Sequence, residues 1–203
     1  RVENDSTVTG YRQTSGWART RTLYFAIRFS KAFKAYGHRK YDTVPYKGFY
    51  RRFDESRNFP EMAGRDIRAW FSFNTEEGEQ LGVRVALSAV SSAGAMHNLA
   101  AEIPHGDFDR VRAEARQRWN RELSKIKVEC LTEADKVVFY TALYHTMLAP
   151  VLFEEIDGSY RGIDQEIHQS GGFTNYTVFS LWDTYRALHP LLNIIHPDRN
   201  RDM

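Results

Sequence analysis

The chain has 203 residues, which is enough for one large domain or two small ones. Hydrophobic residues make up 42% of it and charged residues 27%, a balance that can bury a core and that excludes a disordered chain. Its 28 basic residues are nearly matched by 26 acidic ones and form no long run, so we expect no nucleic acid among its partners.

The single cysteine and the two ends of the chain limit its class further. Cys130 alone excludes an internal disulfide and a Cys-based zinc site. No apolar run approaches the roughly 18 residues that cross a membrane, so we expect no membrane span. The chain begins "RVENDSTVTG" and ends "HPDRNRDM" directly after a helix-like segment. Neither end has the pattern of a natural terminus, and we expect a piece of a longer protein.

The first 90 residues predict strands and turns. "STVTGYRQ" is rich in β-formers, and "RTLYFAIRFS" alternates apolar residues in the period of two that is typical of a half-buried strand (Leu23, Phe25, Ile27 and Phe29). Residues 31–66 are irregular and predict long connections. "RAWFSF" and "LGVRVALSAV" predict two more strands, joined as a hairpin by "NTEEGEQ" with Gly78. Several short strands with one buried face indicate an antiparallel sandwich.

Three helices are predicted next, starting near residue 91. "SSAGAMHNLAAEI" has a serine start, and "HGDFDRVRAEARQRWNRELSKI" has one apolar and one charged face, which is typical of a surface helix. "TEADKVVFYTALYHTMLAP" is apolar on most sides and predicts a buried helix, with a capping box from Thr132 to Asp135 and an end at Pro150. We interpret His145 within it as a core histidine.

The segment that follows predicts turns with solvated charges. Asp157-Gly158 in "FEEIDGSYRG" is a strong hairpin signal. We assign the acidic residues of these loops to solvent rather than to catalysis (Glu154, Glu155, Asp157, Asp164 and Glu166).

"FSLWDTYRALHPLL" predicts one amphipathic helix, because its apolar residues recur at helical spacing (Leu181, Tyr185, Leu188, Leu192 and Ile195). Ser180 is placed to cap this helix, and Asp183 lies at its third position, where a carboxylate favours the positive end of the helix dipole. Two interpretations stay open: Trp182-Asp183 is ordinary helix-start chemistry, or it is the wall of a sugar site. His189 and His196 share the face, but no third ligand is spaced with them, so we expect no metal.

Several segments together resemble glycoside hydrolase family 92. They are "FYTALYHTMLAP", "DGSYRG" and "YTVFSLWDTYRALHPLL", preceded by "GYRQTSGWA", "LYFAIRFS", "VRVALSAVSSAGAMHNLAAEIP" and "FDRVRAEARQRWNRELSKIKVE". The family comprises calcium-dependent, exo-acting, inverting α-mannosidases that are largely bacterial. The resemblance covers nearly the whole chain.

The resemblance implies an α+β multidomain fold. Residues 1–104 would be part of an antiparallel β-sandwich, 105–128 a helical linker, and 129–203 the first helices of an (α/α)6 barrel that forms the catalytic domain. The barrel would be incomplete, so we expect the apolar helix at 133–149 to be left exposed without the barrel segment that follows in the same protein.

The resemblance also implies a function. The chain would be a fragment of a periplasmic or secreted α-mannosidase that hydrolyses terminal α-linked mannose, with α-1,2 linkage, from mannose-containing glycans. An inverting glycosidase needs an acid and a base about 6.5–9.5 Å apart, and the resemblance places both after Met203, with none in this chain. The main Ca²⁺ ligands are expected there too. A non-catalytic carbohydrate-binding or interaction module stays the alternative.

The resemblance assigns site residues within "SLWDTYRALHPL". It implies that Asp183 hydrogen-bonds the hydroxyls of the terminal mannose, with Trp182 as a second substrate-binding residue. Thr184 and Arg186 would support them, and Arg186 could orient Asp183 through a charge-assisted hydrogen bond.

Overall fold

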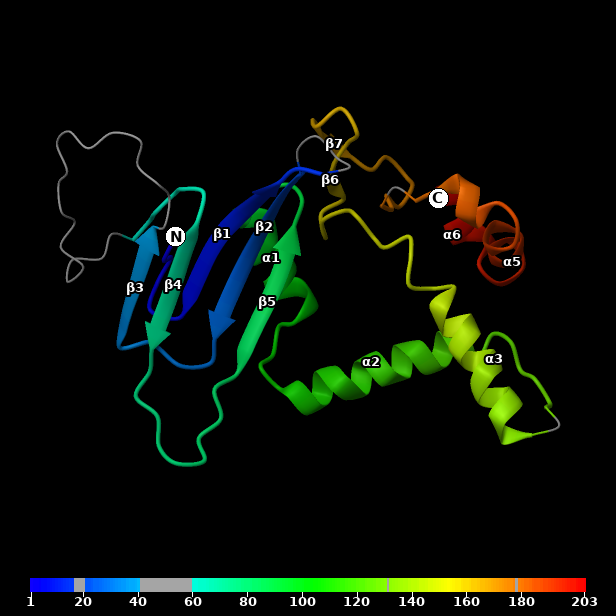
Figure 1. The fold of residues 1–203 in the computed structure, drawn as a ribbon, viewed down its shortest axis with the longest axis horizontal. Helices are drawn as coiled ribbons and strands as arrows, with labels where there is room; N and C mark the ends of the chain where they lie inside the picture. The colour runs from blue at the N-terminus through cyan, green and yellow to red at the C-terminus, as the bar shows by residue number, and fades with distance from the viewer. Residues whose placement is uncertain (17–20, 41–59, 131, 178) are drawn as a thin grey trace. The chain divides into compact units, whose positions relative to one another are not determined.

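A computed structural model describes residues 1–16, 21–40, 60–130, 132–177 and 179–203. The chain divides into two compact units, Arg1–Gly106 and Asp107–Met203, which Figure 1 colours from blue to green and from green to red. The first unit is mainly antiparallel sheet with one helix, and the second is mainly helix. The chain is therefore a mixed α+β structure, as its sequence predicted.

The first unit contains two antiparallel sheets (Figure 1). A three-stranded sheet has the order β1-β2-β5, and β3 pairs with β4 in a separate two-stranded sheet. The strands are β1 (Thr7–Thr14), β2 (Arg21–Phe29), β3 (Ala35–Lys40), β4 (Ile67–Ser72) and β5 (Val83–Ser88).

The two strands around Gly78 were predicted correctly, but their pairing as a hairpin was wrong. β5 pairs with β2, placing Ala86 opposite Ala26, and β4 pairs with β3. Gly78 does occupy a turn, with φ of 80°. β3 lies in a segment predicted to be a connection, and residues 41–59 of that segment lie outside the described residues. Pairing between distant strands depends on the packing that each register permits, which loop composition does not encode.

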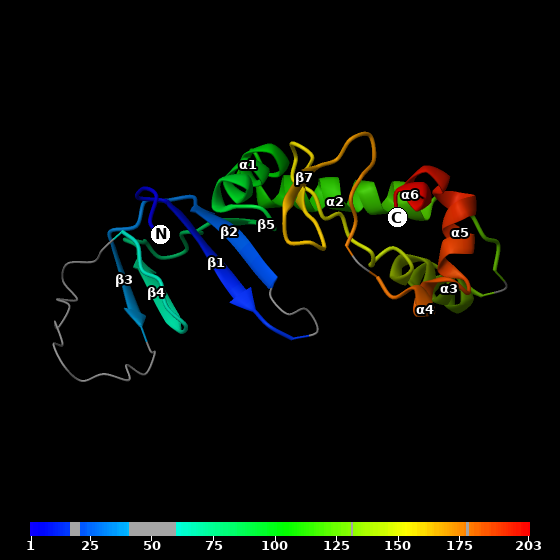
Figure 2. The same ribbon diagram turned by 90° about the horizontal axis from the view of Figure 1, so that it is seen from above.

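Helix α1 (Ser92–Glu102) covers one face of the three-stranded sheet (Figure 2). The Ser91 hydroxyl accepts a hydrogen bond from the amide of Gly94 and caps the helix. Ala95 and Leu99 pack against Ala26, which is 0% exposed, and together they form the core of this unit. Alanine on β2 allows the helix to approach the sheet closely.

The opposite face of this sheet is apolar and only partly covered. The strand predicted for β2 forms, but its burial does not alternate, and the residue that it buries fully is Ala26 and not one of the larger apolar set. On β5, the side chains of Val83, Val85 and Leu87 are each about half exposed. Near the end of β2, Phe29 lies 5.4 Å from Phe71 of β4, ring centre to ring centre, and joins the two sheets.

The second unit contains five helices and a short hairpin among its described residues. They are α2 (Phe108–Leu123), α3 (Glu133–His145), β6 (Ser159–Arg161), β7 (Ile167–Gln169), α4 (Leu181–Thr184), α5 (Leu188–Ile195) and α6 (Pro197–Asp202). β6 and β7 pair antiparallel, with Tyr160 opposite His168.

Helix α3 begins as predicted, with the Thr132 hydroxyl accepting from the Asp135 amide at 3.1 Å. It ends at His145, earlier than expected, and Leu143 is its one buried residue. Val137 and Val138 are 64% and 68% exposed, so the prediction of a buried helix is wrong for the described residues, and the helix is left uncovered as the resemblance implied.

The interpretation of His145 as a core histidine was wrong, because its side chain is exposed at the last turn of α3. Helix α2 likewise buries no residue fully, although Trp119 contacts the ring of Tyr144 on α3 with ring centres 4.6 Å apart. Both helices form as predicted, but among the described residues few groups cover their apolar side chains.

The single helix predicted for 181–195 is interrupted. α4 ends at Thr184, and α5 begins at Leu188 after a residue, Ala187, whose backbone is not helical. Pro190 supplies the physical reason: a continuous helix would need an amide hydrogen at this position to bond the carbonyl of residue 186, and proline has none. A proline is tolerated only in a first turn, so a new helix starts just before it.

The turn at Asp157-Gly158 forms, with Gly158 at φ of 81°, but it leads into β6 instead of joining two paired strands. The strands that do pair, β6 and β7, flank residues 162–166. Glu155 is buried, with an exposed fraction of 6%, so its assignment to solvent was wrong. Asp164 is exposed as expected, and it lies 2.8 Å from the His168 ring nitrogen Nε2.

Candidate functional site

The predicted sugar-binding residues lie on α4, a single helical turn. Ser180 occupies its N-cap position, but its side chain makes no capping hydrogen bond. Thr184 is buried, and its hydroxyl donates to the carbonyl of Ser180 at 3.1 Å. This bond from residue i to i−4 closes the turn, so Thr184 contributes to the shape of the site without facing solvent.

Trp182 presents its ring to solvent and is 72% exposed. The Arg186 guanidinium lies over this ring, 5.5 Å from its centre, and 5.7 Å from the ring centre of Tyr185. Arg186 also donates from Nε to the Tyr185 hydroxyl at 3.3 Å. An exposed cation–π contact contributes about 0.5–1 kcal/mol, so Arg186 stabilises the orientation of the indole ring.

Asp183 belongs to α4, but its side chain lies outside the described part of the chain. The predicted contact between Arg186 and Asp183 therefore stays a prediction. The structure brings Trp182, Tyr185 and Arg186 together on one surface, and it places Thr184 beneath that surface as a support.

The segment that enters α4 is held by hydrogen bonds to the segment that follows α3. Thr177 donates from its amide to the Val151 carbonyl at 2.8 Å, and its hydroxyl accepts from the Val151 amide. Asn175 donates from Nδ2 to the Phe153 carbonyl, and its own carbonyl accepts from the Phe153 amide, each at 2.8 Å. These bonds link residues more than 20 positions apart and fix where α4 begins.

The two histidines considered as a metal pair have separate partners. His189 Nδ1 lies 2.7 Å from Asn200 Oδ1, and its ring centre is 5.0 Å from that of Phe179. Within the described ranges, no group of three or more His, Cys, Asp or Glu side chains could hold a metal ion. Ca²⁺ takes about six to eight oxygen ligands, so the described residues of this chain do not by themselves form a calcium site.

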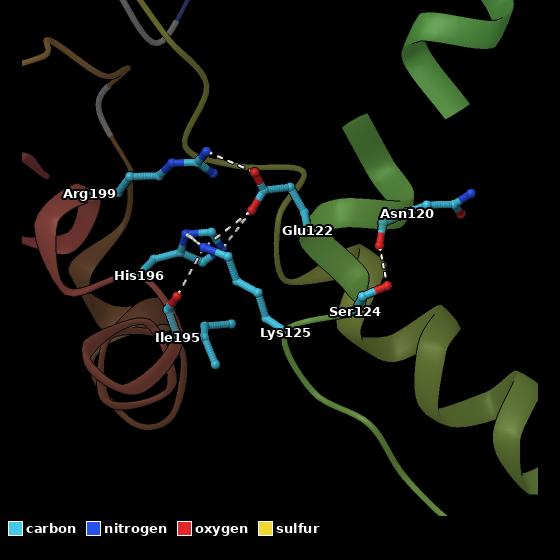
Figure 3. A network of polar contacts seen from close by, with 7 residues as sticks. All are labelled: Asn120, Glu122, Ser124, Lys125, Ile195, His196 and Arg199. Carbon is cyan, nitrogen blue, oxygen red and sulfur yellow. Dashed lines mark hydrogen bonds and ion pairs between the residues drawn. The ribbon is translucent and has the colours of Figure 1, made fainter. Parts of the chain in front are cut away.

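An ionic cluster around a buried histidine lies where the end of α2 meets the junction of α5 and α6 (Figure 3). Arg199 Nη2 lies 3.0 Å from Glu122 Oε1, and His196 Nε2 lies 3.3 Å from Glu122 Oε2. Lys125 Nζ lies 2.9 Å from His196 Nδ1, and it donates to the Ile195 carbonyl at 3.2 Å. We call Glu122, Lys125, His196 and Arg199 the ionic clasp.

The clasp shifts the protonation equilibria of two of its members. Burial lowers the pKa of His196, Lys125 and Arg199 lower it further, and Glu122 opposes them. Burial raises the pKa of Glu122, but Arg199 and Lys125 more than offset this, and the pKa lies below its ordinary value. At neutral pH the carboxylate is therefore charged and the imidazole is neutral.

Sequence reasoning missed the clasp. It treated the charged face of the helix that contains Glu122 as surface, and it considered His196 only together with His189, as a metal pair that it rejected. The carboxylate and Arg199 are 77 positions apart in the chain, and no local pattern joins them. The spacing of Glu122 and Lys125 on one helix turn is the one local signal, and that spacing is common on surface helices.

An open pocket of about 490 Å³ adjoins the clasp in the second unit. Its lining combines two apolar side chains with charged ones and includes none of the predicted sugar-binding residues (Arg118, Trp119, Arg121, Glu122, Met147 and Arg199). Among the described residues, no helix is long and apolar enough to span a membrane.

Two family models match the chain and together span most of it. Residues 1–88 match the "Glycosyl hydrolase family 92 N-terminal domain" and residues 94–203 match the "Glycosyl hydrolase family 92 catalytic domain". The chain belongs to glycoside hydrolase family 92. The resemblance inferred from its sequence motifs is thus confirmed.

Solved structures of family 92 enzymes are similar to the chain. A family 92 α-mannosidase from Bacteroides thetaiotaomicron is 39% identical, with a TM-score of 0.87, over 100% of this chain and 27% of that one. A structure of the same enzyme with mannoimidazole gives the same identity and TM-score over 26% of that chain. A family 92 inverting mannosidase from Bacteroides thetaiotaomicron is 28% identical, with a TM-score of 0.78, over 93% of this chain and 25% of that one.

The chain thus spans about a quarter of the length of these solved relatives. A search of curated proteins found no match.

Proposed function

We propose that the chain is part of an exo-acting α-mannosidase that hydrolyses terminal α-linked mannose, preferentially α-1,2-linked, with inversion. The observation that carries this proposal is 39% identity over the whole chain to a family 92 α-mannosidase. The complex of that enzyme with mannoimidazole, and the relative described as an inverting mannosidase, support the substrate and the stereochemistry.

In this proposal Asp183 and Trp182 form part of the wall that receives the terminal mannose. Asp183 accepts hydrogen bonds from two sugar hydroxyls, and the exposed indole of Trp182 borders the sugar ring. Thr184 and Arg186 hold these residues in place, through the bond to the Ser180 carbonyl and the contact with the Trp182 ring. The exposure of Trp182 supports this assignment because it leaves the indole accessible to a ligand.

The remaining parts of the enzyme lie, in this proposal, in the longer protein. Residues 1–104 belong to a β-sandwich, 105–128 to a linker and 129–203 to the start of an (α/α)6 barrel. The half-exposed Val85 on β5 and the exposed Val138 on α3 support this, because both are apolar surfaces that further chain would cover.

The general acid, the general base and the Ca²⁺ ligands come from chain after Met203, and the enzyme acts in the periplasm or outside the cell. No step of the reaction is assigned to a residue of this chain beyond binding and orienting the sugar. The role proposed for it is to position the scissile bond relative to the acid and the base, which an inverting enzyme holds about 6.5–9.5 Å apart.

The test is hydrolysis of mannobiose by the full-length protein, with the first-formed anomer followed by proton NMR. We expect mannose to be released as the β-anomer, faster from α-1,2- than from α-1,3- or α-1,6-linked mannobiose, and lost on chelation of Ca²⁺. An α-1,2-linked glucobiose serves as the control substrate. Binding of mannose without any release of product would overturn the proposal and favour a non-catalytic carbohydrate-binding module.

A further inference from the structure

We propose that the ionic clasp is an acid-sensitive fastening, in which neutral His196 holds the α5–α6 junction on the end of α2 and protonation of its imidazole releases it. This proposal is independent of the mannosidase activity and concerns the packing of the second unit alone.

The position of the clasp makes it a fastening between elements that are far apart in the chain. Glu122 lies in the last turn of α2, and Lys125 follows that helix by two residues. His196 is the residue between α5 and α6, and Arg199 lies in α6. Every interaction of the clasp shown in Figure 3, apart from that of Glu122 with Lys125, joins the end of α2 to this junction.

The contacts of the imidazole define its protonation state. An ammonium group can only donate, so the 2.9 Å contact from Lys125 Nζ requires an unprotonated Nδ1 on His196. The proton of the neutral ring then lies on Nε2, which is 3.3 Å from Glu122 Oε2 in an electrostatic contact without hydrogen-bond geometry. The His196 side chain is 3% exposed, so water does not replace either partner.

Protonation of His196 would disrupt this arrangement. A proton on Nδ1 would face the Lys125 ammonium, so the hydrogen bond would be lost and two like charges would be in contact. The charged groups that face the ring are Glu122 and Lys125 from the end of α2 and Arg199 from α6. A charged imidazole would be a third cation around a single carboxylate, and because the ring itself is buried, Glu122 alone does not offset its charge.

The direction of the pH dependence follows from the lowered pKa of the folded state. An unfolded histidine titrates at about 6.5, and His196 in the folded chain titrates below its ordinary value. The stability that the clasp contributes is thus complete above about pH 6.5 and is lost as the pH falls from there through the folded-state pKa. Since only three residues separate the end of α4 from the start of α5, release would also free the end of α4.

The test is hydrogen–deuterium exchange of the full-length protein by mass spectrometry at pH 7.5 and 5.5, corrected for the intrinsic effect of pH on exchange. We expect protection of peptides covering 188–202 to fall by up to about tenfold, because pH 5.5 lies about one unit below the pKa of an unfolded histidine. Protection of α1 peptides, 92–102, should not change and serves as the internal reference.

His196→Gln supplies the variant that cannot be protonated, with an amide oxygen to accept from Lys125 and an amide nitrogen to face Glu122. We expect its protection in 188–202 to be equal at the two pH values. His97→Gln, at an exposed position of α1, is the matched control and should behave as the wild type.

Two outcomes would overturn the proposal. One is equal protection of 188–202 at both pH values in the wild type, which needs no variant to fold. The other is an acid-dependent loss in His196→Gln as large as in the wild type. Lys125→Met gives an independent check: without the ammonium at Nδ1 the acid-dependent loss should shrink, and an unchanged or larger loss would contradict the role given to Lys125.

Discussion

Different forces stabilise the interior of each of the two units of this chain. In the first, α1 packs on the sheet through Ala26, Ala95 and Leu99, so that buried apolar surface supplies the stability. In the second, an ionic clasp joins α2 to the α5–α6 junction, while apolar residues of α3 such as Val138 stay exposed. The unit with the uncovered helix is also the one that carries α4 and its proposed sugar contacts.

Removing the carboxylate of Asp183 is expected to have the largest effect, and it tests the assignment of ligand binding to the second unit. Hydrogen bonds to a charged group contribute about 1.5–3 kcal/mol each, so loss of two should lower kcat/KM of the full-length enzyme by about 10³-fold in Asp183→Ala. Steady-state kinetics on α-1,2-mannobiose measures this, with circular dichroism to confirm the fold. Asp109→Ala, at an exposed position of α2, is the control, and equal activity of both variants would remove Asp183 from the site.

Leu99→Ala tests whether buried apolar surface stabilises the first unit. Leu99 lies on α1 and is buried against the sheet, and removing its side chain from a packed core should lower the free energy of unfolding by about 3 kcal/mol. Urea denaturation of the 203-residue chain measures the change. Val138→Ala in the same chain should cost at most about 0.5 kcal/mol, because the side chain is already exposed.

The same Val138→Ala substitution sharpens the comparison when it is made in the full-length protein. If further chain covers α3, the cost should rise to about 1.5 kcal/mol through the lost burial of two carbon atoms. An equally small loss of stability in the 203-residue chain and in the full-length protein would mean that this face of α3 stays in solvent. That result would contradict a closed helical barrel.

Glu122→Gln tests whether the ionic clasp stabilises the second unit. The substitution leaves Arg199 and Lys125 without their shared anion, and we expect it to destabilise the second unit by about 2 kcal/mol at neutral pH. The pKa of Glu122 is lowered in the folded chain, so its contribution to the free energy of unfolding is present above about pH 4.5 and is lost as the pH falls further. The variant should not show this loss of stability in acid. Thermal denaturation from neutral to acidic pH measures both. Glu114→Gln, paired with Arg110 on the surface of α2, should change stability by less than about 0.5 kcal/mol.

Trp182→Ala is expected to have the smallest effect on stability, about 0.5 kcal/mol, because the exposed indole contacts mainly Arg186. The substitution should weaken sugar binding more than it weakens the fold, so KM for mannobiose should rise severalfold while the melting temperature stays nearly unchanged. Trp70→Ala on β4, a half-exposed tryptophan of the first unit, is the matched control. A KM equal to that of the wild type would leave Trp182 as a purely structural residue of α4.

Local patterns in the sequence determined the family, most elements and several of their boundaries. The alternation in β2, the serine before α1 and the Thr132–Asp135 pair at the start of α3 each act within a few residues, so each could be predicted from the sequence. The motif around Trp182 and Asp183 was sufficient to indicate the family. Pro190 carried the signal for the break between α4 and α5, but the apolar spacing across it favoured one helix.

Tertiary structure alone decided which elements meet. The pairing of β5 with β2, the burial of Ala26 in preference to larger neighbours and the contact of Glu122 with His196 and Arg199 all join residues that are distant in the chain. Such contacts depend on which surfaces can approach once the elements have formed, and residue spacing does not record this. His196, which the sequence analysis considered only for a metal site and rejected, lies between α2 and α6 as a neutral partner of a lysine.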